Sequence, residues 1–202
     1  MLGCVLMASG LGRRFGGDKL MADFDGSPLI SRALAATADL FDKRVLLTRS
    51  AAAAEFARAR GVAVTLHTLP RRSDAMRLGL GQMAEMDGCL FCPCDQPLLT
   101  RQTVAALAAA FARQPGTIWR LSAAGQPGAP VVFPRWAFAE LAAVQQGGGS
   151  AVAAAHPDRV CLLKVDAWEL FDVDTPADLA AALAHYRADS TAPRRTSSNS
   201  SE

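Results

Sequence analysis

Glycines and cations are concentrated in one segment close to the start of the chain. Between Ala8 and Lys19 the sequence reads ASGLGRRFGGDK, which contains four glycines and three cations. Glycine lets backbone N–H groups turn toward an anion, and arginine and lysine add positive charge for phosphates. The segment predicts a loop that binds a triphosphate, with a flexible surface turn as the alternative. Gly16 comes one residue too late for a dinucleotide-binding loop, and Asp18 before Lys19 breaks the P-loop pattern.

Carboxylates follow apolar runs in two distant parts of the chain. Asp95 comes just after the apolar residues 88–93, and Asp172 and Asp174 stand two residues apart much further on. Side chains at i and i+2 of an extended segment share a face, so Asp172 and Asp174 are both able to point at one ion. Oxygen ligands of this kind suit a hard dication that bridges to phosphates. By itself, Asp95 is equally suited to capping the next turn.

The elements that must position these side chains alternate along the chain. Strands are expected at residues 2–7, 44–48, 62–66, 88–93, 118–121, 131–133 and 160–165, and helices at 28–41, 51–60, 74–86, 101–113, 136–144 and 176–187. The expected helix N-caps are Ser27, Ser73, Thr100 and Thr175. Strands separated by helices predict an α/β domain with a mainly parallel sheet, which binds ligands at the carboxyl ends of its strands.

Composition limits the class of protein. A chain of 202 residues with half of them apolar favours a single domain, here residues 1–187, followed by a disordered polar tail at 188–202. A net charge of +2 gives no indication of a nucleic-acid partner or of a membrane surface. The five cysteines fall mostly in apolar runs, and no signal peptide is visible. Buried reduced thiols and a cytoplasmic location are therefore expected.

Five segments, taken in order, resemble the signatures of the nucleotidyltransferases that act on the molybdenum cofactor. Residues 8–19 are similar to A-x-G-x-[SG]-x-R-[MF]-G-x-x-K, and residues 94–100 (CDQPLLT) to the metal-binding motif of the molybdopterin cytidylyltransferase branch. Residues 172–179 resemble D-[IV]-D-T-P-E-D-L. Residues 73–80 and 125–133 resemble two further family segments, on the nucleotide side and the acceptor side. The resemblance spans residues 2 to about 184.

The resemblance implies a fold and a set of site residues. The fold is a three-layer, Rossmann-like domain of the nucleotide-diphospho-sugar transferase type. Arg14, Lys19 and Asp95 are the expected catalytic residues, and Asp95, Asp172 and Asp174 the expected ligands of Mg²⁺, with the choice between the last two open. The expected nucleotide-binding residues are Ala8, Ser9, Gly10, Gly12, Arg14, Lys19, Ser73 and Asp74. Asp178 is expected to serve the N-terminus of its helix instead.

The activity that the resemblance implies is transfer of CMP from CTP to the phosphate of a molybdopterin-type cofactor, with release of pyrophosphate. Family members that use CTP carry L-A-A-G before the loop and those that use GTP carry L-A-G-G. Ser9 matches neither pattern, so guanylyl transfer remains an alternative. An Asp found in many members is replaced in the run Gln145–Ser150. Transfer to another small phosphate, such as a sugar or polyol phosphate, therefore also stays open.

The partners expected from the resemblance are the NTP, the molybdopterin-type cofactor, and a molybdoenzyme or its chaperone, with neither nucleic acid nor membrane. A protein that only carries the cofactor to a molybdoenzyme is the non-enzymatic alternative. Lys19 and Asp95 argue for catalysis, because a carrier has no need of a carboxylate that binds metal.

Overall fold

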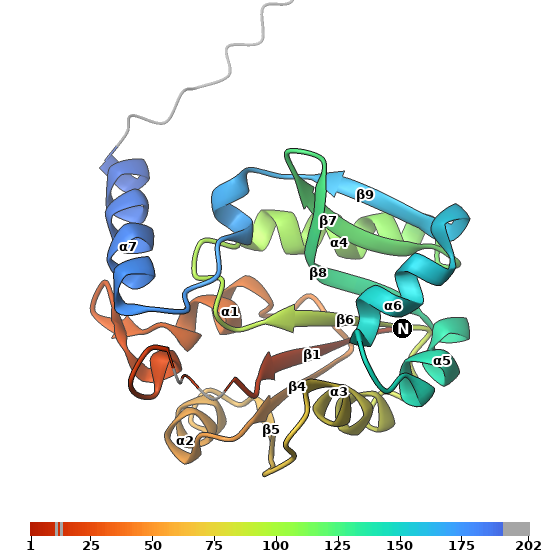
Figure 1. Cartoon of the computed structure of the whole chain (residues 1–202), viewed down its shortest axis with the longest axis horizontal. Coiled ribbons are helices and arrows are strands. Elements are labelled where there is room, and N and C mark those ends of the chain that lie inside the picture. The colour runs from red at the N-terminus through yellow and green to blue at the C-terminus, as the bar shows by residue number, and fades with distance from the viewer. Residues whose placement is uncertain (11, 13, 192–202) are drawn as a thin grey trace, which may run out of the picture.

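A computed structural model describes residues 1–10, 12 and 14–191. Within them, seven strands form one sheet in the order β5-β4-β1-β6-β8-β7-β9 (Figure 1). The strands are β1 (Leu2–Ala8), β4 (Lys43–Thr48), β5 (Ala63–Leu66), β6 (Gly88–Pro93), β7 (Ile118–Ala123), β8 (Gln126–Pro134) and β9 (Val160–Lys164). All of them run in one direction except β8, which is antiparallel to both of its neighbours.

Helices cover both faces of the sheet and complete the three-layer α/β domain that the sequence predicts. One face packs against α1 (Ile30–Ala36), α2 (Ala51–Arg58), α4 (Arg101–Arg113) and α7 (Pro176–Thr191), and the other against α3 (Arg72–Gly81), α5 (Phe138–Ala143) and α6 (Gly148–Ala155). The short 3₁₀ helices are η1 (Lys19–Met21), η2 (Arg135–Ala137), η3 (Pro157–Arg159) and η4 (Ala167–Leu170). A separate hairpin pairs β2 (Asp23–Phe24) with β3 (Ser27–Pro28).

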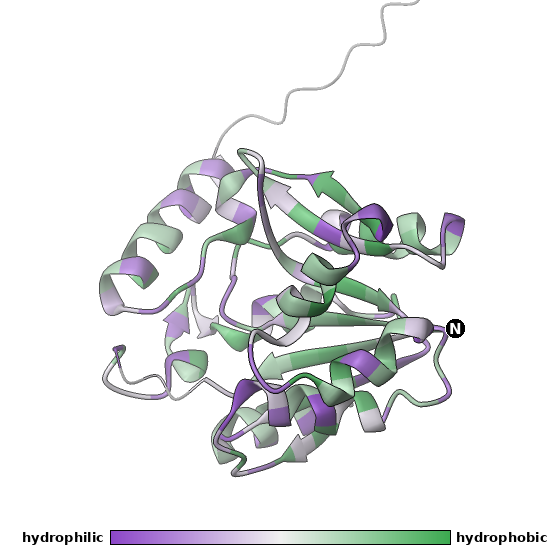
Figure 2. Ribbon diagram, turned by 45° about the vertical axis from the view of Figure 1, so that its right-hand side comes forward, coloured by the Kyte–Doolittle hydropathy of each residue, from purple (hydrophilic) through white to green (hydrophobic). Residues whose placement is uncertain are grey.

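The central strands are apolar on both sides because both of their faces are covered. Along β1, Cys4 and Leu6 pack into the cluster under α1, α2 and α4, whereas Val5 and Met7 pack into the cluster under α3, α5 and α6. Continuous apolar runs of this kind are typical of buried parallel strands. Figure 2 shows the strands at the middle of the molecule as mostly hydrophobic and the helices around them as a mixture of hydrophilic and hydrophobic residues.

Strand order fixes the place of a ligand. From β1 the chain continues to β4 on one side, whereas β6, which it reaches later, lies on the other side of β1. A crevice opens outside the carboxyl ends of parallel strands where the order reverses in this way. The loops that follow Ala8 and Pro93 therefore lie next to each other, and they are the loops in which the sequence places the glycine-rich segment and Asp95.

The prediction of a helix that starts at Ser27 and Pro28 is wrong. These two residues form β3, the second strand of the small hairpin, and α1 begins only at Ile30. Asp25 and Gly26 connect the two strands with φ values of 56° and 83°. Positive φ at both central residues is the signature of a tight hairpin turn, for which Asp-Gly is a preferred pair. Ser27 and Pro28 resemble the start of a helix in sequence, but they pair with β2 in the hairpin instead.

The bounds of two other helices also differ from the prediction. Ser73 is not an N-cap: it lies inside α3, which begins at Arg72 after Arg71 and has no side-chain cap. That helix ends at Gly81 instead of extending to Met86. Helix α7 continues to Thr191, past the end predicted near residue 187, and the remainder of the expected tail, residues 192–202, lies outside the described residues.

Two predicted caps are present. Thr100 accepts the backbone N–H of Thr103 at 3.1 Å at the start of α4. Thr175 accepts the backbone N–H of Asp178 at 3.2 Å, and the carboxylate of Asp178 in turn accepts the backbone N–H of Thr175 at 2.8 Å. A hydrogen bond from the Thr175 hydroxyl to the same carboxylate at 2.8 Å, and then the backbone N–H groups of Thr175 and Asp174, lower the pKa of Asp178. The carboxylate of Asp178 therefore serves the helix N-terminus, as expected. None of the helices in the described part of the chain has the length and apolarity needed to cross a membrane.

Candidate active site

The side chain of Lys19 joins three segments that are far apart in sequence. Its Nζ donates to Oδ2 of Asp95 at 2.8 Å, to the carbonyl oxygen of Val173 at 2.8 Å and to Oδ1 of Asp174 at 3.0 Å. Only 8% of the Lys19 side chain is exposed. Lys19 is held there by η1, whose first turn is capped by the carboxylate of Asp18. The contacts bring the glycine-rich loop, the end of β6 and the segment before α7 to one point.

Opposing effects set the charge of this lysine. Burial lowers the pKa of Lys19, but the charges and hydrogen bonds of Asp95 and Asp174 outweigh burial and raise the pKa overall. The ammonium therefore stays charged and offsets the negative charge of both carboxylates. Desolvation, and then the nearby charge of Asp95, raise the pKa of Asp172, although a hydrogen bond from Gln96 opposes the shift. That bond joins Nε2 of Gln96 to Oδ1 of Asp172 at 3.1 Å.

The three carboxylates expected to bind Mg²⁺ are not grouped as a ready-made metal site. Among the residues that the structure describes, no three His, Cys, Asp or Glu side chains are placed so that they hold an ion together. Lys19 contacts both Asp95 and Asp174, whereas Asp172 is engaged by Gln96. Mg²⁺ commonly takes one or two protein carboxylates and completes its shell with phosphate oxygens and water. The pair Asp95 and Asp174 fits that requirement, since both side chains face one cation.

The segment before α7 is anchored to the end of β6 by its backbone. The N–H of Val173 donates to the carbonyl oxygen of Asp95 at 2.8 Å. Arg14 adds a contact from the glycine-rich loop, because its Nη2 donates to Oδ2 of Asp174 at 2.7 Å. The Arg14 side chain is 73% exposed, so the guanidinium is free to turn toward a ligand.

Gly12 allows the glycine-rich loop to fold back on itself. Its φ is +58°, and a Cβ at this position would lie 2.4 Å from the carbonyl oxygen of Gly17. The carbonyl oxygen of Gly12 also accepts the N–H groups of Phe15 at 2.9 Å and Gly16 at 3.1 Å. Any side chain at this position would push the two arms of the loop apart. The close approach explains why the loop needs glycine here.

Three adjoining hollows line the carboxyl edge of the sheet. A loop pocket of about 330 Å³ lies between the glycine-rich loop and Ser50. A middle pocket of about 280 Å³ lies against Ser9 and Asp95, and it shares Gly10 and Arg49 with the loop pocket. A large cavity of about 670 Å³ extends toward α6, and it shares residues with the middle pocket: Met7, Arg71, Arg72 and Pro93. We refer to these three adjoining hollows together as the trough.

In the described part of the chain, most of the expected nucleotide-binding residues line this trough, but Ala8, Arg14 and Asp74 line none of its three hollows. Ser9 and Gly10 line the middle pocket, Gly12 and Lys19 line the loop pocket, and Ser73 lines the large cavity. Ala8 is buried in β1, and its carbonyl oxygen accepts the hydroxyl of Thr48. Asp74 lines none of the three hollows in the described part of the chain, because its carboxylate turns to Arg77 on the same helix at 3.2 Å.

Sequence reasoning missed the pair formed by His67 and Ser9. The backbone N–H of Leu69 donates to Nδ1 of His67 at 3.2 Å, so the hydrogen of the neutral ring is on Nε2 and points to Oγ of Ser9 at 2.8 Å. Burial, and then the charge of Arg49, lower the pKa of His67. The imidazole is neutral at pH 7 and holds the Ser9 hydroxyl at the edge of the middle pocket. His67 follows β5 directly, at the carboxyl edge of the sheet, and this position is the feature of the sequence that indicates a place near the site.

The cysteines near the site are structural. Cys92 and Cys94 flank Pro93 at the end of β6, both are buried, and both are free thiols. Burial raises the pKa of Cys92 to about 12 and that of Cys94 well above its ordinary value. The thiols stay protonated near neutral pH and supply no nucleophile. The chemistry of the trough therefore rests on its cations and carboxylates.

Comparisons with known proteins found a family and several solved structures that this chain resembles. Residues 4–160 match the family described as MobA-like NTP transferase domain. A comparison with curated protein sequences gave no significant match. Among solved structures, Rv0371c of Mycobacterium tuberculosis H37Rv is 24% identical, with a TM-score of 0.76 and coverage of 91% of this chain and 97% of that one. The same protein has also been solved in complex with manganese.

Two more distant structures share the fold. A nucleotidyl transferase of Methanothermobacter thermautotrophicus, Mth528, is 18% identical, with a TM-score of 0.79 and coverage of 94% of this chain and 99% of that one. The CMP-2-keto-3-deoxy-manno-octonic acid synthetase complexed with CTP is 14% identical, with a TM-score of 0.74 and coverage of 93% of this chain and 99% of that one. These likenesses establish the nucleotide-diphospho-sugar transferase type of fold that the sequence predicts.

Proposed function

The chain belongs to the MobA-like NTP transferase family and is a nucleotidyltransferase, and we propose that it transfers CMP from CTP to the phosphate of a molybdopterin-type cofactor. Pyrophosphate is the second product. The observation that carries the proposal is the contact of the Lys19 ammonium with Asp95 and Asp174 at the carboxyl edge of the sheet. A cation and two carboxylates at one point are the groups that phosphoryl chemistry needs, because it depends on positioning and on neutralising charge.

The triphosphate belongs in the loop pocket. The backbone of Gly10 and Gly12 lines that pocket together with Lys19. Exposed N–H groups of a glycine-rich loop form an anion-binding concavity, and a lysine adds a full charge. Arg14 lies on the same loop and is free to reach the leaving pyrophosphate.

Asp95 and Asp174 are the proposed ligands of Mg²⁺. Both carboxylates contact the same ammonium, at 2.8 Å and 3.0 Å, so they face one common point. When it is bound there, the ion neutralises phosphate charge beyond what Lys19 and Arg14 supply. The manganese complex of Rv0371c supports a divalent metal in a protein of this fold.

The nucleoside belongs in the middle pocket, between Ser9, Arg49 and the side of Asp95. Cytosine is favoured for two reasons. Residues 94–100 resemble the cytidylyltransferase motif, and a protein of the same fold has been solved with CTP. The acceptor then occupies the large cavity, which adjoins the middle pocket on the side of α3 and α6.

The reaction is a displacement at the α-phosphorus. A terminal phosphate oxygen of the acceptor forms a bond to the α-phosphorus, and the bond from that phosphorus to the bridging oxygen of pyrophosphate breaks. Lys19 and Arg14 stabilise the charge on the departing pyrophosphate. No covalent enzyme intermediate is required, and the buried thiols beside the site stay protonated.

Pyrophosphate release tests this function. The wild type, Asp95→Asn and the surface variant Asp158→Asn should be incubated with CTP, Mg²⁺ and molybdopterin cofactor. We expect Asp95→Asn to lose at least about 100-fold in rate, while Asp158→Asn, on exposed η3, behaves as wild type. The Asp95 variant should still fold, because its bond to Val173 uses the backbone carbonyl.

Each of the other results of this experiment has a definite meaning. Full activity of Asp95→Asn contradicts the metal assignment. Faster release with GTP than with CTP overturns the choice of base. Release with a sugar or polyol phosphate, and none with the cofactor, overturns the choice of acceptor. Binding of the cofactor with no release for any NTP favours a carrier that delivers the cofactor to a molybdoenzyme.

A further inference from the structure

Arg120 places a guanidinium in the wall of the large cavity, where no described residue pairs with it. The residue lies in the middle of β7 and lines the cavity. Its Nε is buried and has no hydrogen-bond partner among residues 1–10, 12 and 14–191. None of the ion pairs in the described part of the chain includes Arg120. A half-buried guanidinium that has no carboxylate beside it is unfavourable for the fold, so a ligand in the cavity that supplies an acceptor to this group is bound favourably.

Strand register shows which way this side chain faces. Arg120 is paired with Val131 of β8, and Val131 is paired with Phe91 of β6. Paired residues of antiparallel strands project from the same face of the sheet. Phe91 and Val131 belong to the apolar cluster beneath α3, α5 and α6, so Arg120 projects on that side as well. Two strand spacings, roughly 10 Å, separate it from β6, after which Asp95 follows.

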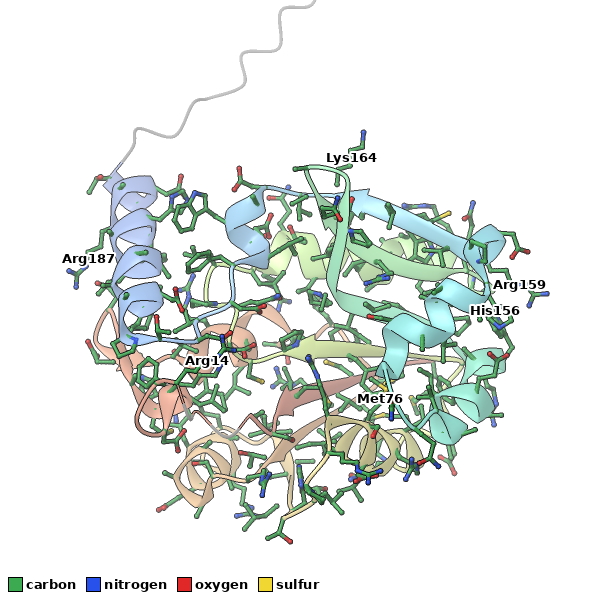
Figure 3. All side chains as sticks on the ribbon, in the orientation of Figure 1. Arg14, Met76, His156, Arg159, Lys164 and Arg187 are labelled. Atoms are coloured by element: carbon green, nitrogen blue, oxygen red, sulfur yellow. The ribbon has the colours of Figure 1, made fainter. Side chains whose placement is uncertain are left out.

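The rest of the cavity wall is apolar, basic or neutral and polar, the last from Ser73, Gln145, Gln146 and Ser150. Its apolar part comes from Met7, Met76, Phe91, Val131 and Phe133, and its cations are Arg71, Arg72 and Arg120. No Asp or Glu is among the described residues that line the cavity. Met76 reaches from α3 toward the start of α6, and its Cε is 3.7 Å from the position of a Cβ on Gly148 (Figure 3). The cavity therefore suits a ligand with an apolar body and negatively polarised ends.

We propose that Arg120 binds a second oxygen-rich group of the acceptor, at the end remote from the phosphate that reacts. The inference rests on the proposed function, which places the reacting phosphate near Asp95 and Lys19. The acceptor then has three parts: that phosphate, an apolar body over Met76 and Phe133, and a carboxylate, phosphate or carbonyl edge at Arg120. Guanidinium binds such groups through two parallel N–H donors, which fixes orientation as well as affinity.

A purely structural role does not explain the arginine. Burial lowers the pKa of Arg120, which reflects the unfavourable surroundings of its charge. Methionine would fill the same space between apolar neighbours without an unpaired charge. The variant Arg120→Met should therefore melt at or above the wild-type temperature, so a loss of ligand binding in it is not a loss of fold.

Calorimetric titration with two small probes tests the inference without nucleotidyl transfer. Phenyl phosphate has one anionic end, and 4-carboxyphenyl phosphate has a second at the opposite end of the ring. The wild type with MgCl₂ should bind the second probe at least about tenfold more tightly than the first, because a charge-assisted bond forms at the carboxylate. Arg120→Met should bind the two probes equally, within about twofold. Lys164→Met, which removes an exposed cation outside the cavity, should keep the wild-type preference.

Three results would overturn the inference: equal binding of the two probes by the wild type, a preference that survives in Arg120→Met, or no binding of either probe by the wild type. CTP binding is measured in the same proteins and should be unaffected by Arg120→Met. If the wild type fails to bind CTP while the probe preference follows Arg120, the proposed function is wrong and the site at Arg120 stands. If CTP binds normally and the preference is missing, only the inference about Arg120 fails.

Discussion

Lys19 and Asp95 are 76 residues apart in sequence, yet Nζ of the first lies 2.8 Å from Oδ2 of the second. The contact joins the loop after β1 to the loop after β6 across the point where strand order reverses. The ammonium stands beside the two carboxylates that we propose as ligands of Mg²⁺. A cation therefore already occupies the environment that a metal with its nucleotide would need.

Removal of the Lys19 charge should have opposite effects on metal binding and on catalysis. Lys19→Met takes a positive charge away from Asp95 and Asp174, so Mn²⁺ should bind the nucleotide-free protein about fivefold to tenfold more tightly. Turnover should fall by about 100-fold or more, because the leaving group loses its cation. Mn²⁺ binding is measured by electron paramagnetic resonance, with the exposed Lys43→Met as control. Unchanged Mn²⁺ affinity in Lys19→Met would show that the metal does not bind beside this ammonium.

The variants Asp172→Asn and Asp174→Asn should differ in activity. Asp174 contacts Lys19 and Arg14, whereas Asp172 contacts Gln96, so Asp174→Asn should lose most activity and Asp172→Asn should keep it. The measurement is the rate of pyrophosphate release at saturating CTP as Mg²⁺ is titrated. The reverse pattern would make Asp172 the ligand.

The raised pKa of Asp172 adds a prediction on stability. Its pKa in the folded protein is above the ordinary value of 3.8, so the charged form is disfavoured by folding at neutral pH. Asp172→Asn should melt slightly higher than the wild type at pH 7, a small effect because the carboxylate is only partly desolvated and the residue keeps contact with solvent. The advantage should shrink as the pH falls through the raised pKa and vanish below about pH 3.8. A difference in melting temperature that stays constant across this pH range would show that Asp172 does not titrate as predicted.

His67 should make the site sensitive to mild acid. Its pKa in the folded protein lies below the ordinary value of 6.5, so the unfolded chain takes up the proton first as the pH falls. The stability that the neutral ring supports is present above pH 6.5 and is lost as the pH drops through 6.5 toward the lowered pKa. The melting temperature of the wild type should fall more between pH 7.5 and about pH 5 than that of His67→Gln. Equal losses would mean that another group titrates.

Gly12 and Gly17 offer a matched pair within the triphosphate loop. Gly12→Ala places a Cβ 2.4 Å from the carbonyl oxygen of Gly17 at a positive φ, whereas a Cβ at Gly17 meets no atom within 4 Å. Gly12→Ala should weaken CTP binding by about tenfold or more, since the strain displaces the N–H groups that face the phosphates. Gly17→Ala should weaken it much less. Titration calorimetry with CTP and Mg²⁺ measures both, and similar affinities for the two variants would argue against a role for the folded-back loop.

Local signals explain which parts of the fold were predictable. The caps at Thr100 and Thr175 depend on residues within one turn, and the apolar strands carry their pattern in their own sequence. The prediction of a helix cap at Ser27 was wrong because the residues around it also suit a hairpin with a two-residue turn. The pairing of β2 with β3 decides between the two structures. The alternating strands and helices were enough to predict the layers. The antiparallel position of β8 depends on its place in the finished sheet.

The candidate site residues also differ in how far the sequence alone predicts them. Lys19, Asp95 and Asp174 stand in motifs that can be recognised one at a time, but their mutual contacts bridge up to 155 residues and are visible only in the fold. Arg120 has no motif, because a single arginine within a strand looks like any half-exposed position. His67 is similar, since its meaning comes from Ser9 on a different strand end. The roles proposed for these residues depend on neighbours that only the folded sheet brings to its carboxyl edge.

The most direct test of the central claim is transfer of label from α-³²P-CTP. The wild type, Mg²⁺ and molybdopterin cofactor should give a labelled cytosine dinucleotide of the cofactor together with unlabelled pyrophosphate. Asp95→Asn should give neither product. A wild type that forms no labelled dinucleotide, or an Asp95→Asn protein that forms it at the wild-type rate, would contradict the account.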